Sequence, residues 1–493
     1  MNSPHKALVI IFYVSVMMGL IMLLSPEELY FSKDFVLRIP SWNDFRLDTA
    51  QNQLPTQVVQ VDKTIDSLEK ALKEAEKIRF DNYAPSSETL FVEVKGKSSD
   101  NPIEFPPNHS QALDKFFEAL RTIATQEAPI RILHYGDSQL DGDRISEYLR
   151  ERFQHQFGGC GVGLFPITEA KNMRSTLAQT ASDNWKKQAV YTLQDGKPLS
   201  NRYSVLGSYY WIGKQDNEKY QKATLTIART PNSSLRNAQF EKFHLLLKNI
   251  DAPLIVEYAF NDANKQVDTI PPADHTKWYP LPIAGNLEEL DLWFYAKGET
   301  YFYGASLDCS KGIALDNIAF RGSSGTDFIH FSRTHLREQF DLLNVRLIIL
   351  QFGVNVVPNV IEDYKYYENS LYRQLNFLKT LVPEADVLLI GVSDMAQRLG
   401  GRLRTYPNIA LVRNAQRSAA FKARCAYWDL FLAMGGENSI INWANASPPL
   451  AQKDYTHFTR RGAKLVGEML YNQLMKEYND YLRRKDPARK HWG

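Results

Sequence analysis

Residues 130–139 read IRILHYGDSQ, and this stretch determines the fold that we expect for the chain. Its first five residues, 130–134, are largely apolar and β-branched, with Pro129 before them and Gly136 shortly after. This pattern is typical of a buried parallel strand that ends in a tight turn. The stretch therefore predicts an α/β fold with Ser138 just beyond a strand.

A helix is predicted directly after this turn. Over residues 143–153 the apolar positions have helical spacing, and the residues on one face are Ile145, Tyr148, Leu149 and Phe153. Ser138 is thus expected between the carboxyl end of a strand and the start of a helix. Open α/β sheets bind ligands at that edge, where helix amides stabilise developing negative charge.

The Asp454-Tyr-Thr-His457 segment near the other end of the chain carries groups that would activate a serine. A carboxylate three residues before a histidine can reach back to Nδ1 from the same loop. It would fix the tautomer and leave Nε2 free to accept the proton of Ser138. Helical spacing resumes at residues 460–478.

Two further predicted strands end in groups that donate hydrogen bonds. Residues 346–355, RLIILQFGVN, form an apolar run that ends in a glycine turn, with Asn355 just beyond it. Residues 317–322, NIAFRG, form a shorter run that ends at Gly322. The amide side chain of Asn355 and the backbone N–H of Gly322 could both stabilise an oxyanion.

The order Ser, Gly, Asn and Asp-x-x-His resembles the SGNH (GDSL-type) hydrolase family. The resemblance implies that Ser138 is the nucleophile, that His457 is the general base and acid, and that Asp454 orients His457. It also implies an oxyanion hole formed by the Ser138 amide, the Gly322 amide and the Asn355 side chain. No metal and no cofactor are expected.

Three positions complicate the resemblance. Val356 follows Asn355 where the family usually has an aspartate, so a supporting carboxylate is missing. Gln139 replaces the leucine of the GDSL name. Gly325 lies close enough to Gly322 in the sequence to compete with it for a place in the oxyanion hole.

Residues 169–311 differ from the blocks on either side in the spacing of their apolar residues. Short, partly alternating runs are separated by Gly, Asn, Asp and Pro, at residues 222–229, 243–248, 253–260 and 290–296. This predicts a β-sandwich, and its place resembles the carbohydrate-binding-like insert of peptidoglycan O-acetylesterases. Its aromatic residues either stack on sugar rings or pack the sandwich core: Trp185, Tyr209, Tyr210, Trp211 and Trp293.

After the insert the α/β pattern resumes, with strands expected at 386–391 and 426–430 and helices at 362–381 and 414–424. The order of elements suggests a flavodoxin-like three-layer sheet. The loop after residue 391 should overhang the active site, and we name Gln139, Arg398 and Trp211 as candidate substrate contacts.

The expected divisions are a transmembrane signal anchor (1–28), a stalk with a helical segment (29–105), the first part of the SGNH domain (106–168), the inserted β-sandwich (169–311), the second part of the SGNH domain (312–482) and a basic tail (483–493).

Residues 7–24 are apolar except for Ser15, with Lys6 before them and Glu27 and Glu28 after them. About 18 residues is near the lower limit for crossing a hydrocarbon core of about 30 Å. Because the positive charge precedes the apolar run and the negative charges follow it, the N-terminus would lie on the cytoplasmic side of the membrane. We therefore expect an uncleaved signal anchor rather than a removed signal peptide. The chain would be a single-pass protein of the bacterial inner membrane, with its catalytic domain in the periplasm.

Composition and cysteine content narrow the functional classes. The formal net charge of +2 and 23% charged residues give no support for a nucleic-acid partner. Cys160, Cys309 and Cys425 allow one disulfide and one buried thiol, or no disulfide, and their spacing fits no zinc motif.

These observations favour a serine esterase that removes O-acetyl groups from an extracytoplasmic polysaccharide through an acyl-serine intermediate. One alternative is an acetyltransferase, in which the same triad passes acetyl from an integral membrane acyltransferase partner to a glycan. The missing acid after Asn355 gives weight to a second alternative, a non-catalytic glycan-binding scaffold. The sequence leaves hydrolysis and transfer unresolved.

Overall fold

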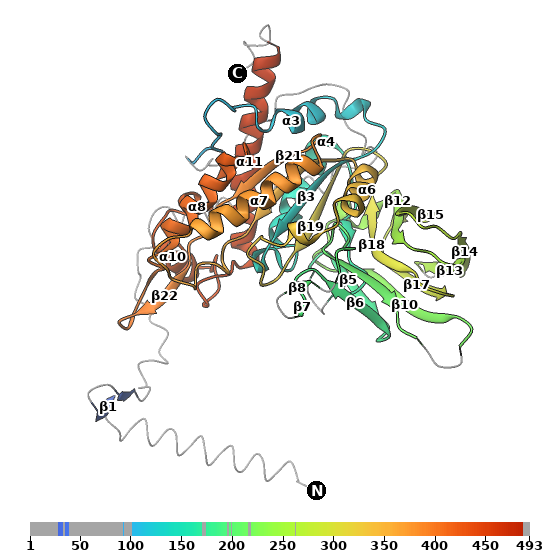
Figure 1. The fold of residues 1–493 in the computed structure, drawn as a ribbon, viewed down its shortest axis with the longest axis horizontal. Coiled ribbons are helices and arrows are strands. Elements are labelled where there is room, and N and C mark those ends of the chain that lie inside the picture. The colour runs from blue at the N-terminus through green and yellow to red at the C-terminus, as the bar shows by residue number, and fades with distance from the viewer. Residues whose placement is uncertain are drawn as a thin grey trace. The chain divides into compact units, whose positions relative to one another are not determined.

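The computed structural model describes residues 28–32, 35–38, 92, 101–169, 174–194, 197–198, 200–214, 218–261 and 263–486. The chain divides into two units, Met1–Thr56 and Gln57–Gly493. In the first unit, β1 (Glu28–Ser32) pairs with β2 (Phe35–Arg38) in an antiparallel hairpin. All other described elements belong to the second unit (Figure 1).

The second unit contains a parallel sheet of five strands in the order β19-β3-β20-β21-β24. The strands are β3 (Ile130–Gly136), β19 (Ile313–Ala319), β20 (Val345–Gln351), β21 (Asp386–Ile390) and β24 (Ala426–Trp428). Every residue of β3 is buried, as expected for a parallel sheet that is covered on both faces. The first strand in the sequence lies between the second and third, which is the flavodoxin-like order. The predicted α/β fold with a parallel central sheet is confirmed.

Helices cover both faces of this sheet (Figure 1). Along β3, Ile130 and Ile132 face one hydrophobic core and Leu133 and Tyr135 face the other, because side chains alternate along a strand. The first core includes α3 (Asp114–Arg121), α4 (Arg144–Phe157), α10 (Ser439–Asn445) and α11 (Arg460–Lys485). The second includes α6 (Arg333–Leu343), α7 (Lys365–Leu381) and α8 (Ile409–Lys422).

Two antiparallel sheets follow α4 and precede β19, and they enclose a hydrophobic core of their own. One sheet runs β14 (Gln266–Ile270), β13 (Leu254–Phe260), β17 (Glu289–Ala296), β10 (Gln221–Arg229) and β5 (Leu177–Ala181). The other runs β15 (Lys277–Leu281), β12 (Lys242–Lys248), β18 (Tyr301–Asp308), β9 (Ser208–Ile212) and β6 (Trp185–Ala189), and β4 (Gly163–Phe165) pairs with β18. A β-sandwich thus lies where the alternating runs indicate one, while the exact domain boundaries stay a prediction.

Shorter elements complete the second unit. They are η2 (Ile123–Thr125), η3 (Ser138–Leu140), β7 (Leu193–Gln194), β8 (Lys197–Pro198), α5 (Leu235–Ala238), β11 (Gln239–Phe240), β16 (Gly285–Asn286), η4 (Phe328–His330), β22 (Ala396–Leu399), β23 (Arg402–Thr405) and α9 (Leu430–Ala433).

The aromatic residues of the sandwich divide between its core and its outer faces. The Trp185 ring is buried and packs edge-to-face against Phe302, with ring centroids 4.9 Å apart. Tyr210 is also buried. Core packing therefore accounts for these two rings. Tyr209, Trp211 and Trp293 are partly exposed.

The sandwich is tied to the α/β domain by a disulfide and by a buried ion pair between Arg131 of β3 and Asp308 of β18. Cys160, after α4, is bonded to Cys309, after β18, with the Cα atoms 5.0 Å apart. Cys425 is a buried thiol. The Arg131 guanidinium on β3 lies 2.6 Å from Asp308 and 2.7 Å from Asp316, and all three side chains are buried.

The segment just before residue 106, predicted as the end of a stalk, contacts the α/β domain. Ile103 is buried, and Glu104 exchanges backbone hydrogen bonds with Tyr427 of β24 at 2.7 and 2.9 Å. The backbone N–H of Val92 donates to the side-chain oxygen of Asn479 on α11, and the side-chain NH₂ of Asn479 donates to the backbone carbonyl of Val92. The chain here extends the edge of the sheet.

The membrane prediction requires a correction. Among the residues that the structure describes, no helix combines the length and the apolar character needed to cross a membrane. The predicted span at 7–24 and the helical segment of the stalk lie outside the described residues. We expected a single-pass inner-membrane protein with a periplasmic catalytic domain, and that localisation is wrong as stated, because no described segment supplies its span.

The Arg131→Met variant should test the junction between sandwich and α/β domain. It leaves Asp308 and Asp316 buried without their cation, so we expect the free energy of unfolding to fall by about 3–5 kcal/mol. Urea unfolding followed by tryptophan fluorescence measures the loss. Adding Asp308→Asn and Asp316→Asn should recover most of it. A single variant as stable as wild type would show that the ion pairs do not hold the junction.

Candidate active site

The turn that carries Ser138, the predicted nucleophile, is called the nucleophile turn here and comprises residues 137–140. It is shaped by close packing at the end of β3. A Cβ atom on Gly136 would lie 2.7 Å from the carbonyl oxygen of Gln351, so a side chain there would collide with the neighbouring strand. Asp137 then caps η3, where its Oδ1 accepts a hydrogen bond from the Gln139 amide at 3.0 Å. Ser138 is therefore the first residue of a short 3-10 turn. The helix predicted at residues 143–153 is observed as α4, which begins at Arg144.

A second loop, between α10 and α11, brings a histidine to Ser138. Tyr455 has a φ of 53°, and this left-handed conformation turns the chain back on itself. Asp454 Oδ1 accepts hydrogen bonds from the amides of Thr456, at 3.0 Å, and His457, at 3.1 Å. These bonds fix the carboxylate so that its Oδ2 lies 2.7 Å from His457 Nδ1.

Ser138, His457 and Asp454 form a continuous chain of hydrogen bonds. Ser138 Oγ lies 2.7 Å from His457 Nε2. When Nδ1–H donates to Asp454, Nε2 is left as the acceptor for the serine hydroxyl. Burial alone would raise the pKa of Asp454, but the hydrogen bonds from His457 and two amides hold this pKa below its usual value. The carboxylate is therefore ionised when it contacts the imidazole.

Ser138 and His457 open onto a cavity of about 600 Å³. Its lining residues are Ser138, Asp141, Gly142, Arg144, Arg321, Gly322, Asn355, Gln452 and His457. The lining thus includes Gly322 and Asn355 together with Ser138. The predicted oxyanion donors and the predicted nucleophile share one pocket.

The structure separates the two candidate glycines. Gly322 lines the cavity and has a φ of 81°. Gly325 is buried, its N–H donates to Ser323 Oγ at 2.9 Å, and a Cβ there would lie 2.8 Å from the Phe352 ring. Gly325 therefore packs into the core, and its amide is already used.

Asn355 is held by a contact to the neighbouring loop. Its Nδ2 donates to the carbonyl oxygen of Ser323 at 2.9 Å. An amide NH₂ group carries two hydrogens, so this bond orients the group and leaves the second hydrogen for a ligand. Val356, the position where the family usually has an acid, is buried in the hydrophobic core instead.

Asp394 is a second carboxylate in a loop at this end of the sheet, after β21. It is buried, and it accepts hydrogen bonds from Thr405 Oγ1 at 2.8 Å and from the Ile440 amide at 2.9 Å. Burial raises its pKa to about 6. Its contacts join the β22–β23 hairpin to α10, so Asp454 is the carboxylate that contacts His457.

The three candidate substrate contacts lie outside the cavity lining. Gln139 is buried and bonds to the backbone beside His457. Arg398 is exposed on β22 of the hairpin, and Trp211 lies on β9 of the sandwich. Arg144 and Arg321 do line the cavity. No motif in the sequence marks either arginine, although Arg321 directly precedes Gly322.

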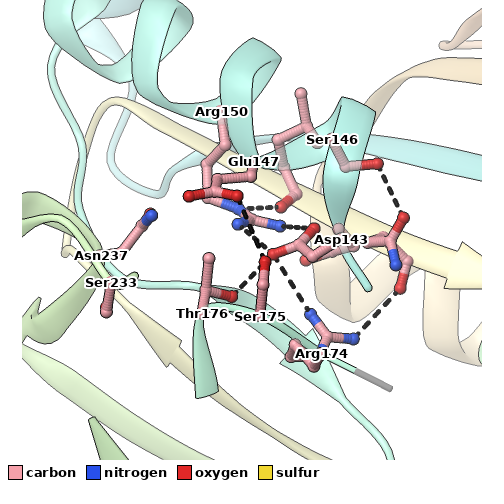
Figure 2. A network of polar contacts seen from close by, with 12 residues as sticks. Asp143, Ser146, Glu147, Arg150, Arg174, Ser175, Thr176, Ser233 and Asn237 are labelled. Atoms are coloured by element: carbon pink, nitrogen blue, oxygen red, sulfur yellow. Dashed lines mark hydrogen bonds and ion pairs between the residues drawn. The ribbon is translucent and has the colours of Figure 1, made fainter. Parts of the chain in front are cut away.

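A buried polar network supports the loop that carries Gly142 (Figure 2). Asp143 has a φ of 62° and accepts hydrogen bonds from Arg150 at 2.7 and 2.9 Å and from Thr176 at 2.7 Å. Burial opposes ionisation, but Arg150 and Arg174 hold the pKa of Asp143 below its usual value. The network joins the start of α4 to the first residues of the sandwich segment, where the Ser175 amide donates to Gly142.

Comparison with known proteins supports the fold. Neither a protein-family model nor a curated protein sequence matches the chain. A solved structure of a peptidoglycan O-acetylesterase aligns with a TM-score of 0.57 at 20% identity, covering 74% of this chain and 96% of that one. The resemblance to SGNH hydrolases is therefore confirmed as a likeness of fold.

Two other solved structures have TM-scores too low to support an argument. A family two carbohydrate esterase from Cellvibrio japonicus has a TM-score of 0.25 at 9% identity, with 62% of this chain and 99% of that one covered. A lipase/acylhydrolase from Enterococcus faecalis has a TM-score of 0.24 at 16% identity, with 34% and 77% covered.

Asp137 provides a pH test of the nucleophile turn. Burial raises its pKa to about 7 in the folded protein, above the ordinary value of 3.8. Between about pH 4 and pH 7 the unfolded chain therefore releases a proton that the folded protein keeps, and stability falls as the pH rises. Asp137→Asn lacks this titration. The free energy of unfolding of wild type minus that of Asp137→Asn should decrease across this window and level off above it.

Urea unfolding at one-unit steps from pH 4 to about pH 8 measures this difference. Other buried carboxyls titrate equally in both proteins and cancel. A difference that does not change with pH would contradict the raised pKa of Asp137.

Proposed function

We propose that this protein is a serine esterase that removes O-acetyl groups from a polysaccharide outside the cytoplasm. The observation that carries the proposal is the hydrogen-bonded series Asp454, His457 and Ser138 at the wall of a cavity. Both hydrogen bonds are 2.7 Å long, and Gly322 and Asn355 line the same cavity. A scaffold that merely bound glycan would not require this arrangement.

The proposed reaction proceeds through an acetyl-enzyme. His457 Nε2 takes the hydroxyl proton as Ser138 Oγ attacks the acetyl carbonyl carbon. The amides of Ser138 and Gly322 and the Asn355 side chain stabilise the oxyanion, each donor contributing about 2.7–4 kcal/mol to the barrier reduction. His457 then protonates the departing sugar oxygen. Water, deprotonated by His457, attacks the acetyl carbon; the bond to Ser138 Oγ breaks, His457 returns the proton to Oγ and acetate is released.

The cavity lining favours a small acyl group and a polar leaving group. Its side chains are polar or charged, and no apolar residue appears among them to form a tunnel for a long acyl chain. The structural likeness to a peptidoglycan O-acetylesterase agrees with an acetylated glycan as substrate. The Cys160–Cys309 disulfide supports a location outside the cytoplasm, because disulfides persist mainly in oxidising compartments.

Ser138→Ala should abolish acetate release from an O-acetylated glycan and from a simple aryl acetate. The variant lacks the atom that accepts the acetyl group, while its fold should be unchanged. Acetate is measured with and without an acceptor sugar, alongside wild type. Turnover equal to wild type would rule out Ser138 as the nucleophile, and acetyl transfer to the acceptor would replace the esterase proposal with an acetyltransferase.

Asp454→Asn should lower kcat by about 10⁴-fold, as the equivalent change does in the well-studied serine protease triad. The asparagine amide can donate to Nδ1, which favours the tautomer whose Nε2 cannot accept the serine proton. Asp394→Asn is the matched control. Its carboxylate contacts the hairpin and α10, so kcat should change by less than about 3-fold. Equal losses in the two variants would remove Asp454 from its proposed role.

A further inference from the structure

Gln139 contacts the backbone on both sides of His457. It directly follows Ser138 and is 1% exposed. Its Nε2 donates to the carbonyl oxygen of Thr456 at 2.7 Å, and its Oε1 accepts from the amide of Phe458 at 3.3 Å. One carboxamide on the nucleophile turn therefore binds the two peptide groups that flank the histidine.

These contacts matter because the two catalytic side chains of the histidine loop are partly exposed, although Phe458 beside them is buried. The side chains of Asp454 and His457 are 44% and 30% exposed, so little packing holds them. Hydrogen bonds to a buried amide restrain the backbone that carries the imidazole. A displacement of about 1 Å in a catalytic group can reduce the rate by about 100-fold.

Arg144 makes a second tie between the same two loops. Its Nη2 donates to the carbonyl oxygen of Ser138 at 3.0 Å, and its Nη1 donates to that of Phe458 at 2.7 Å. Its Nε donates to the carbonyl oxygen of Asp141 at 2.6 Å. Gln139, next to Ser138, and Arg144, at the start of α4, thus both bind the backbone of the histidine loop.

We propose that Gln139 is a positioning residue that holds His457 Nε2 against Ser138 Oγ, an inference that rests on the proposed esterase function. Its side chain acts on the loop and not on the substrate, which replaces our expectation that Gln139 contacts substrate. A leucine at this position would form neither hydrogen bond. The histidine loop would then keep its hydrogen bonds to Arg144 and to the Ala396 amide, the packing of Phe458 and its own internal contacts.

Gln139→Met tests the inference, because methionine has a similar length but no amide. Gln339→Met is the matched control, since Gln339 is also buried and binds backbone groups of Tyr203, His335 and Val205. With an aryl acetate, Gln139→Met should lower kcat by about 10- to 100-fold and change KM by less than about 3-fold. Gln339→Met should keep kcat within about 2-fold of wild type.

A coupling measurement separates positioning from general loss of stability. In a His457→Ala background, Gln139→Met should cause less than about a 2-fold further loss, because no imidazole remains to be positioned. A full further loss in that background would overturn the proposal. If wild type is active and Gln139→Met has the same kcat, the positioning role is also overturned. The esterase proposal would then stay intact.

A proton NMR measurement decides the same point without turnover. The Nδ1 proton of His457, hydrogen-bonded to Asp454, should give a resolved downfield resonance in wild type and in Gln339→Met. In Gln139→Met it should broaden or disappear. An unchanged resonance would overturn the positioning role. An inactive wild type with the expected NMR result would instead contradict the esterase proposal alone.

Discussion

The hydrogen bond between Ser138 Oγ and His457 Nε2 joins two loops whose residues are 319 positions apart. Neither loop can place its side chain alone, so the bond depends on the sheet and helices that bring the loops together. β3 is buried between β19 and β20, and its register with β20 puts Gly136 opposite Gln351. Gly136 lies so close to the carbonyl oxygen of Gln351 that no side chain fits there. The chain turns directly after Gly136, and the 3-10 turn begins at Ser138.

The same sheet explains why the proposed oxyanion donors, Gly322 and Asn355, share a cavity with Ser138. Parallel strands end at one edge, so the turns after β3, β19 and β20 are neighbours even though a sandwich separates β3 from β19 in the sequence. The disulfide and the Arg131 ion pairs hold the sandwich at its base. The Asp143 network reaches from the sandwich segment to the cavity wall (Figure 2). The inserted segment is thus part of what holds the pocket in shape.

Sequence patterns predicted the parts of this protein that depend on local periodicity. The expected strand at 222–229 is observed as Gln221–Arg229, and the helix expected at 362–381 is observed as Lys365–Leu381. Alternating apolar residues indicate a strand and apolar residues at helical spacing indicate a helix, so these two elements follow from local spacing. The motif spacing also indicated which polar residues meet at the sheet edge.

Contacts between distant segments could not be predicted in this way. The 3-10 turn Ser138–Leu140, which Asp137 caps, lies between β3 and the helix that begins at Arg144, and no periodicity shows this turn. The choice between Gly322 and Gly325 depends on the Phe352 ring. The hydrogen bonds of Gln139 to the backbone at Thr456 and Phe458 could not be predicted either, because these partners are over 300 residues away in the sequence. The sequence also led to a membrane localisation that had to be corrected.

The account depends on Ser138 becoming acetylated during turnover. Rapid quenching of wild type mixed with an aryl acetate, followed by peptide mass spectrometry, tests this directly. We expect an acetyl group on the peptide that contains Ser138, formed in a burst before steady-state release of acetate. Acetate release with no acetyl group on that peptide, or with the acetyl group on another residue, would contradict the proposed mechanism.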